Sequence, residues 1–433
     1  MIRWIFQGVV RDKTRSLFPF LVVTSGVALM IFLIGFMEGI FMNMIDMTAN
    51  LDTGHLRFVN KPFYDEEYLR PLDRALAAQK ETLAWLKKNG DPKIQWSPRI
   101  RWSAIMDVPN EKGETLAQTP VTGLALDLLS PGSDELKRLK LDTKKALTQG
   151  RLPRAPKEAL VGYQLARTLR LQLGKKFTLI GQTFDGGLAA DNYTAVGFIK
   201  FGVFAMDKKM ALIDLADAQD TFYMGDMVTD WLGFLPPRVP FAEYEKMKLQ
   251  LESRLKEFQP PQAWAKDDVP IVKTIAEQRN IGALTRKFMV IKSIIVGIFL
   301  SLMVLVLWNA GLLNSIHRYG EIGLRLAMGE THFRLIAALL FEAFVVGALG
   351  CLAGSVVGGA AVYYLQEVGV DMGENLAKTG LMLSDVSRAR MSLSAFIHGI
   401  VPGMTASVFG SLMAALAIFK RSEADLFREL EAG

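Results

Sequence analysis

The sequence predicts an α-helical membrane protein with four transmembrane helices, both termini in the cytoplasm, and a large α+β extracytoplasmic domain between the first two helices. Four apolar stretches contain no Asp, Glu, Lys or Arg: residues 17–37, 293–316, 343–366 and 391–419. Each meets the roughly 20 residues that an α-helix needs to cross about 30 Å of hydrocarbon. Between the first two stretches lie roughly 240 residues of ordinary soluble composition. With 50% hydrophobic and 22% charged residues, the chain needs both a lipid and an aqueous environment.

The N-terminal residues 1–16 mix Ile2, Trp4 and Phe6 with basic side chains. This pattern favours an amphipathic helix on the cytoplasmic face of the membrane, the alternative being a basic flank that only sets topology. The remaining elements are expected in the following order: a first transmembrane helix at 17–45, the extracytoplasmic domain at 46–288, a second transmembrane helix at 289–316, a cytoplasmic helix at 317–334, a third transmembrane helix at 335–366, an extracytoplasmic loop at 367–390, a fourth transmembrane helix at 391–419 and a cytoplasmic tail at 420–433.

Short basic segments indicate the orientation. Residues 1–16, 317–334 and 420–433 carry the basic side chains that flank the apolar stretches. By the positive-inside rule all three segments face the cytoplasm, and four crossings return the chain to the same side. The first stretch is longer than the apolar part of a signal peptide and lacks a small-residue cleavage site, so we expect a retained anchor.

The extracytoplasmic domain has segments of both secondary-structure types. Strands are expected where β-branched and apolar residues partly alternate: 53–60, 94–108, 120–126, 177–180, 194–200 and 210–214. Helices are expected where the apolar spacing is near 3.6 residues: 74–88, 164–171 and 242–258, followed by a stalk helix at 274–288 that runs into the second transmembrane helix.

The cytoplasmic segment 317–334 carries charges at helical spacing. Glu321 lies three residues after Arg318 and four before Arg325, so opposite charges meet on one face of a helix. A solvated connector is the plain alternative. An apolar strip for another surface is expected from three residues: Ile322, Leu326 and Met328.

The run Arg318-Tyr-Gly-Glu321-Ile322-Gly323-Leu-Arg325-Leu-Ala-Met-Gly329, followed by Glu342, resembles the R-x-x-E-I-G-x-x-R-A-x-G … E signature of FtsX-like permeases. These are the membrane subunits of ABC transporters that include MacB and the lipoprotein-releasing (LolC/LolE) permeases. The extracytoplasmic domain also has a succession of segments similar to that of lipoprotein-releasing permeases: 150–153, 158–166, 173–179, 195–199 and 207–219.

The resemblance implies a type VII ABC permease in the bacterial inner membrane, with the large domain in the periplasm and divided into Porter and Sabre subdomains. It implies that Arg318, Glu321, Ile322, Gly323, Arg325 and Gly329 form the coupling site for a cytoplasmic ABC ATPase. The chain has no G-x-x-x-x-G-K-[ST], so the ATPase is expected on a separate protein, which binds ATP and Mg²⁺. A second permease protomer, identical or paralogous, and membrane lipids are the other expected partners; this chain itself needs no cofactor.

Several residues of the membrane segments stand out. Glu38 and Lys292 flank the outer ends of the first two transmembrane helices, as an interfacial pair or as two independent snorkelling heads. Glu342 matches the family's Glu and either holds the coupling helix or snorkels. Small residues predict close helix packing along the third transmembrane helix: Gly347, Gly350, Gly354 and Gly358.

An enzyme is not expected, because the chain lacks a G-x-S-x-G or H-E-x-x-H motif and its four His are scattered. Basic residues cluster at the membrane flanks, which accounts for them without nucleic-acid binding. Two function classes remain. One is ATP-driven extraction or export of a lipoprotein, lipid or amphiphile; the other is FtsX-type mechanotransmission to a periplasmic partner such as a cell-wall hydrolase. The segment 181–192 has no Pro, Arg or Lys, so a flexible loop is expected there rather than the chaperone-recruiting hook of one lipoprotein-releasing subunit.

Overall fold

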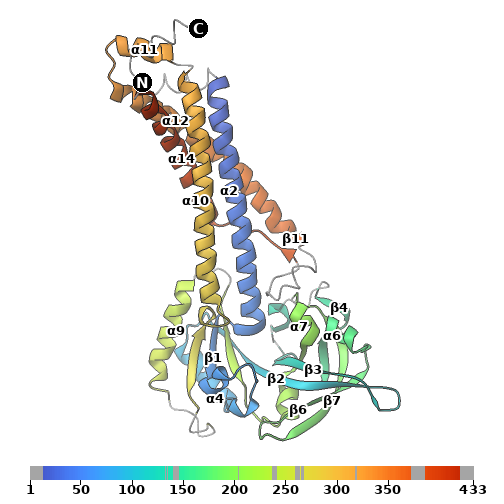
Figure 1. The fold of residues 1–433 in the computed structure, drawn as a ribbon. Helices are drawn as coiled ribbons and strands as arrows, with labels where there is room; N and C mark the ends of the chain where they lie inside the picture. Colours follow the sequence, from blue (N-terminus) through green and yellow to red (C-terminus); the bar gives the residue numbers. More distant parts are fainter. Residues whose placement is uncertain are drawn as a thin grey trace. The chain divides into compact units, whose positions relative to one another are not determined.

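The computed structural model describes residues 13–131, 133, 135–139, 146–202, 204–236, 241–258, 264, 268–316, 319–371 and 386–419 (Figure 1). The chain divides into two compact units, each described by itself. The membrane unit comprises Met1–Met42, Arg286–Val370 and Ser387–Gly433, and the extracytoplasmic unit comprises Asn43–Thr285 and Asp371–Val386. Residues 1–12 of the predicted N-terminal amphipathic helix and the predicted C-terminal tail lie outside the described residues, and residues 13–16 belong to the first long helix of the membrane unit.

Four of the described helices are long and apolar enough to cross a membrane. They are α2 (Lys13–Thr48), α10 (Ile281–Ile316), α12 (His332–Val368) and α14 (Leu393–Phe419). Much of their apolar surface stays uncovered by protein, Val356 being 72% exposed, because lipid rather than protein solvates such a face. The predicted class, a four-helix membrane protein with an α+β domain, is confirmed.

The stalk helix expected at 274–288 begins later. Thr274 ends strand β10 (Pro270–Thr274), and its side chain and that of Glu277 form a capping box around the short helix η3 (Ile275–Glu277). Arg279 and Asn280 then adopt positive φ, a conformation that a helix cannot contain. Helix α10 therefore starts only at Ile281.

Part of the extracytoplasmic unit is a β-α-β-β-α-β layer of the ferredoxin-like type. Its elements are β1 (Leu56–Asn60), α4 (Gln79–Asn89), the start of β2 (Gln95–Pro109), β9 (Asp230–Phe234), α9 (Phe241–Leu255) and β10. The strands lie in the order β10-β1-β9-β2, and every neighbouring pair is antiparallel. Aromatic contacts of Phe58 on β1 with Trp85 on α4 and with Phe258 help to join the sheet to its helical face.

The rest of the unit is inserted between β2 and β9 and closes on itself. Strand β2 pairs in turn with β3 (Thr115–Leu126), and the ring continues through β8 (Met210–Asp214), β5 (Glu158–Gly162), β7 (Leu188–Ile199) and β6 (Lys176–Gln182) back to β2. The short β4 (Leu147–Gly150) pairs with β7. Strand β2 thus belongs to both the layer and the ring, and it is where the two subdomains meet.

Large buried side chains fill the ring. Met106 pairs with Leu179 across β2 and β6, and Phe177 stacks on Tyr193, with ring centroids 6.1 Å apart. Trp102 lies over Gly123 so closely that a Cβ on this glycine would overlap the indole. The ring is therefore a packed core rather than a binding cavity.

Short elements complete the fold: η1 (Ala49–Thr53), α3 (Lys61–Asp65), η2 (Leu72–Arg74), α5 (Glu135–Arg138), α6 (Tyr163–Thr168), α7 (Phe204–Lys209), α8 (Leu215–Thr221), α11 (Tyr319–Ala327), β11 (Val370–Asp371) and β12 (Val386–Ser387).

The prediction of a flexible loop at 181–192 was wrong. Strands β6 and β7 extend through most of it and leave only residues 183–187 as a turn. Gly186 supplies the positive φ of 84° that the turn requires, and the Thr183 amide donates to the Gly187 carbonyl at 2.9 Å. Cross-strand pairing, which the composition of the segment concealed, orders it.

Candidate coupling sites

The predicted coupling segment contains one short helix, α11, and a defined stop. At its end Glu330 N donates to Arg325 O and Gly329 N to Leu326 O, with Gly329 at a φ of 87°. This is a Schellman motif, which needs a residue without Cβ strain at this position. Helix α12 then begins at His332, so 317–334 is not one continuous helix. The Gly of the signature thus ends α11 and turns the chain into the next transmembrane helix.

The structure describes only part of the predicted coupling residues. Arg318 lies outside the described residues, as do the side chains of Glu321 and Ile322 on α11. Arg325 is half-buried. A Cβ on Gly323 would meet nothing within 4 Å. A Gly within a helix costs roughly 0.5–1 kcal/mol of stability relative to Ala. Since Gly323 carries no side chain and its surroundings are open, another surface can approach the helix closely at this position.

Exposed apolar side chains follow the same segment. Leu324 is 63% exposed, Met328 four residues later is 72% exposed, and Phe333 is 80% exposed. Leu326, which the sequence placed in the apolar strip, is half-buried instead. Leu324 and Met328 therefore form the apolar face of this segment, and an exposed face of this kind marks an interaction site.

The predicted small-residue stripe packs within the chain. A Cβ on Gly354 would lie 2.7 Å from the Thr24 carbonyl oxygen of α2, and one on Gly358 would lie 2.7 Å from the Ala28 carbonyl oxygen. Gly350 also approaches α2, whereas a Cβ on Gly347 would lie 2.8 Å from Ser407 Oγ of α14. Since these approaches are internal to one chain, they give no support to a second protomer. Glu342 is half-buried on α12.

Glu38 and Lys292 belong to a polar cluster that joins α2 and α10 to the start of α14. Lys292 Nζ lies 3.1 Å from Glu38 Oε1 and 3.2 Å from Ser394 Oγ of α14. Ser394 Oγ donates to Glu38 Oε1 at 2.8 Å, and Ser392 donates to Glu38 Oε2. The carboxylate and the ammonium thus link α2 and α10 to the start of α14. His398 accompanies the cluster, its Nδ1 2.7 Å from the Ser394 carbonyl oxygen.

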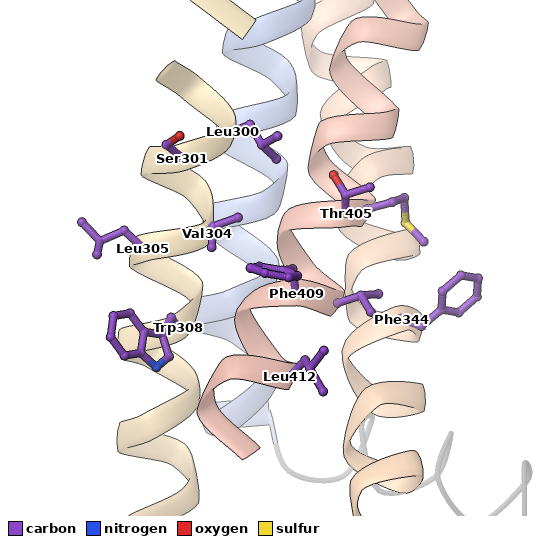
Figure 2. Close-up of a pocket in the computed structure, with 11 residues that line it drawn as sticks. Leu300, Ser301, Val304, Leu305, Trp308, Phe344, Thr405, Phe409 and Leu412 are labelled. Atoms are coloured by element: carbon purple, nitrogen blue, oxygen red, sulfur yellow. The ribbon is translucent and has the colours of Figure 1, made fainter. Parts of the chain in front are cut away.

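An apolar groove opens between α10, α12 and α14. It has a volume of about 830 Å³. In Figure 2, Leu300 and Val304 on α10 point toward Phe409 on α14, with Phe344 of α12 nearby. The hydroxyl groups in its lining are occupied by their own helices, as for Thr405, which donates to the Val401 carbonyl at 2.9 Å.

A ring of largely buried charge, which the sequence analysis missed, lies in the extracytoplasmic unit. Its six members alternate in sign and form ion pairs in this order, with only Arg279 about half exposed: Asp52, Arg101, Asp230, Arg57, Glu67, Arg279 and back to Asp52. Arg101 Nε lies 2.8 Å and Arg57 Nε 2.7 Å from the same oxygen of Asp230. Arg279 bonds Asp52 at 2.8 Å and Glu67 at 2.7 Å. We call these six residues the charge ring.

The charges of the ring hold one another ionised. Burial would raise the pKa of Asp230, but Arg101 and Arg57 outweigh it and lower this pKa below its ordinary value. Burial likewise disfavours charged Arg101, yet Asp230 and Asp52 raise its pKa. Buried pairs fix geometry more reliably than they add stability. The ring therefore fixes η1, where the chain has just left α2, and Arg279, two residues before α10, onto strands β1, β2 and β9.

One sequence signal pointed to this site. Arg57, Arg99 and Arg101 interrupt strands that are otherwise largely apolar, and all three are at most 2% exposed. Arg99 pairs with Glu135 of α5, which also accepts from Ser97 at 2.6 Å. Burial would raise the pKa of Glu135, but Arg99 and Arg138 lower it. Among the described residues, no His, Cys, Asp and Glu cluster has the makings of a metal site.

The comparisons with known proteins agree with these features. The family described as "FtsX-like permease C-terminal" matches residues 293–422, and the family described as "MacB-like periplasmic core domain" matches residues 17–241. A solved structure, that of the periplasmic region of MacB from Actinobacillus actinomycetemcomitans, is 13% identical, with 53% of this chain and 92% of that chain covered and a TM-score of 0.33. No curated protein matches the chain. The MacB-like match alone spans more than half of the 433 residues, and the chain belongs to the FtsX-like, MacB-type permeases of ABC transporters, whose partner is a cytoplasmic ABC ATPase.

Proposed function

We propose that this permease extracts or exports a lipoprotein, a lipid or another amphiphile from the bacterial inner membrane. A separate cytoplasmic ATPase binds ATP and Mg²⁺ and docks on the segment around α11. Its closure moves the large periplasmic domain. In this proposal the chain acts as the non-catalytic permease subunit.

The apolar groove of the membrane unit is the observation that carries this proposal. Its lining consists mainly of apolar side chains, and the hydroxyls of Ser301 and Thr405 are already bonded to their own helices. The Nε1 of Trp308 has no hydrogen-bond partner, so the groove offers a single polar donor within a surface that suits an acyl chain, which is stabilised by covering apolar atoms.

The path of force from the ATPase is supported at both ends. On the cytoplasmic side, Leu324 and Met328 offer an exposed apolar face, and Gly323 leaves room for close approach. On the periplasmic side, the charge ring ties Asp52 and Arg279 to the strands of the domain. Displacement of the chain at either residue is therefore passed to β2 and β9 through charged contacts rather than absorbed in a loop.

The test fills the groove. Ser301→Trp should abolish the stimulation of ATPase activity by a synthetic triacylated lipopeptide in the complete complex, while the basal activity stays near that of wild type. Leu302→Trp is the matched control, because Leu302 is the next residue of α10, is 53% exposed and does not line the groove. Equal stimulation of both variants would count against cargo in the groove. If the lipopeptide also fails to stimulate the wild type, mechanotransmission becomes the better proposal.

A further inference from the structure

The uncharged stretches of the four membrane helices end at one level. The uncharged stretch of each helix ends there at a charged residue: Glu38 on α2, Lys292 on α10, Glu367 on α12 and Arg390 just before α14. Contacts place these ends together. Glu38 pairs with Lys292, Arg390 N donates to the Gly35 carbonyl at 3.0 Å, and Met391 N donates to Gln366 Oε1 at 2.9 Å. This level marks the outer boundary of the hydrocarbon, because charged side chains rarely lie deeper.

Aromatic residues and close backbone contacts mark the same level. Tyr363 and Tyr364 are 56% and 64% exposed near the end of α12, as in the aromatic belts at membrane interfaces. Phe41 of α2 stacks on Phe288 of α10, with centroids 4.2 Å apart. Gly39 meets the backbone of Arg388 and Ala389 so closely that no Cβ fits. The segment before α14 is therefore laid directly across α2 at the interface.

The charge at this level is strongly positive. The described residues of the membrane unit supply four cations here besides Arg388, which already has a partner: Arg286, Lys287, Lys292 and Arg390. Two carboxylates of this unit, Glu38 and Glu367, oppose them, and Glu38 is already paired with Lys292. Arg286 and Lys287 are exposed. Basic residues are depleted at the outer ends of transmembrane helices, so this surplus needs a compensating partner.

We propose that Arg286, Lys287 and Arg390 bind the phosphodiester groups of anionic phospholipids in the outer leaflet. These three residues are called the basic belt. The partner must lie at the headgroup level and be anionic, and a phosphodiester meets both requirements. A guanidinium can hold two phosphate oxygens at once, and Lys adds a point charge. The neutral Glu38–Lys292 pair meanwhile fixes α2, α10 and the start of α14, so that the belt is held rigidly against the leaflet.

The experiment maps where lipid contacts the protein. The complete permease–ATPase complex is reconstituted in phosphatidylcholine vesicles that contain a trace of phosphatidylglycerol with a photoreactive headgroup, and the labelled peptides are identified by mass spectrometry. Peptides covering 286–292 and 388–394 should be labelled, and labelling should fall with added salt. The triple variant Arg286→Gln, Lys287→Gln, Arg390→Gln should be labelled at least about fivefold less than the wild type. One basic residue near an anionic surface contributes about 1 kcal/mol, which corresponds to about a fivefold change in binding. Labelling near Arg334, on the cytoplasmic side, is the internal reference and should not change.

Two controls keep the test sharp. A variant with the same loss of charge on the extracytoplasmic unit, Lys80→Gln, Lys246→Gln, Lys256→Gln, should be labelled like the wild type. The single variant Arg390→Lys keeps the positive charge and should retain much of the labelling. The proposal is overturned if photoreactive phosphatidylcholine labels the belt as strongly as phosphatidylglycerol does. It is equally overturned if the triple variant labels normally, or if the control variant loses the same signal. None of these outcomes depends on the cargo or on ATP hydrolysis.

Discussion

Replacing Arg101 by Met should destabilise the extracytoplasmic unit. Arg101 is 2% exposed and bonds two members of the charge ring, Asp230 through Nε at 2.8 Å and Asp52 through its terminal nitrogens. Met fills a similar volume but donates no hydrogen bond. Asp230 keeps Arg57, and Asp52 keeps Arg279, so neither carboxylate is left entirely without a cation.

The size of the effect follows from these remaining contacts. Removing one partner of a buried ion pair costs about 3–5 kcal/mol. Because each carboxylate retains a second cation, we expect the lower end, about 3 kcal/mol. For a unit of this size, 1 kcal/mol shifts Tm by about 2–4 °C, so Tm should fall by about 6–12 °C.

Intrinsic Trp fluorescence reports this transition, since five of the seven Trp lie in the extracytoplasmic unit. The matched control is Arg151→Met, which breaks an ion pair with Glu158 at a site where the Arg side chain is 44% exposed. Surface pairs of this kind contribute little, so its Tm should stay near that of wild type. If Arg101→Met melts within about 1 °C of wild type, or if Arg151→Met is equally damaging, the charge ring is not a structural junction. Arg101→Lys keeps a positive charge beside Asp52 and Asp230. Among variants that fold, it should therefore retain more of the coupling to the ATPase than Arg101→Met.

Three further predictions follow from other sites. Burial lowers the pKa of His55 to about 4, so near pH 5 the unfolded chain binds a proton at this residue that the folded unit does not bind. The free energy of unfolding should therefore fall by up to about 2 kcal/mol between pH 7 and pH 5. His55→Phe should flatten the dependence of Tm on pH over this range, and an unchanged slope would refute the assignment. Gly354→Leu should lower the free energy of unfolding of the membrane unit by about 1–3 kcal/mol through overpacking against α2, whereas Ala360→Leu on an exposed face of the same helix should not. Equal Tm values for the two variants would show that α2 moves aside to accommodate the larger side chain. Leu324→Ser with Met328→Ser should weaken binding of the purified ATPase in a pull-down without altering membrane insertion, and undiminished binding would remove the apolar face from the coupling site.

Much of the architecture could be predicted because it depends on local properties. Hydropathy and charge along the chain predict four crossings, since each helix must satisfy its own backbone within lipid. Alternation within 94–108 and 210–214 likewise predicts strands that the structure contains as β2 and β8. The signature around α11 identified the family, which the matches over residues 17–241 and 293–422 confirm.

Local patterns failed where the environment of a residue comes from distant segments. Strand β9 was missed because its Asp230 suggests a surface turn, yet Arg57 and Arg101 make full burial of this carboxylate possible. The hairpin at 181–192 was missed because its small polar residues resemble a loop until strand β7 is seen to pair with β6.

The sequence by itself determined the class of the protein, the number of crossings and the family, because hydropathy, charge and motif spacing are all written along the chain. Only the tertiary structure decided the closed ring of strands, the charge ring and the level at which the basic belt lies. Asp52 and Arg279 are 227 residues apart in the sequence and 2.8 Å apart in the fold. Such a pair can form only after β1, β2 and β9 have been assembled, because the strands supply the buried partners that make each charge tolerable.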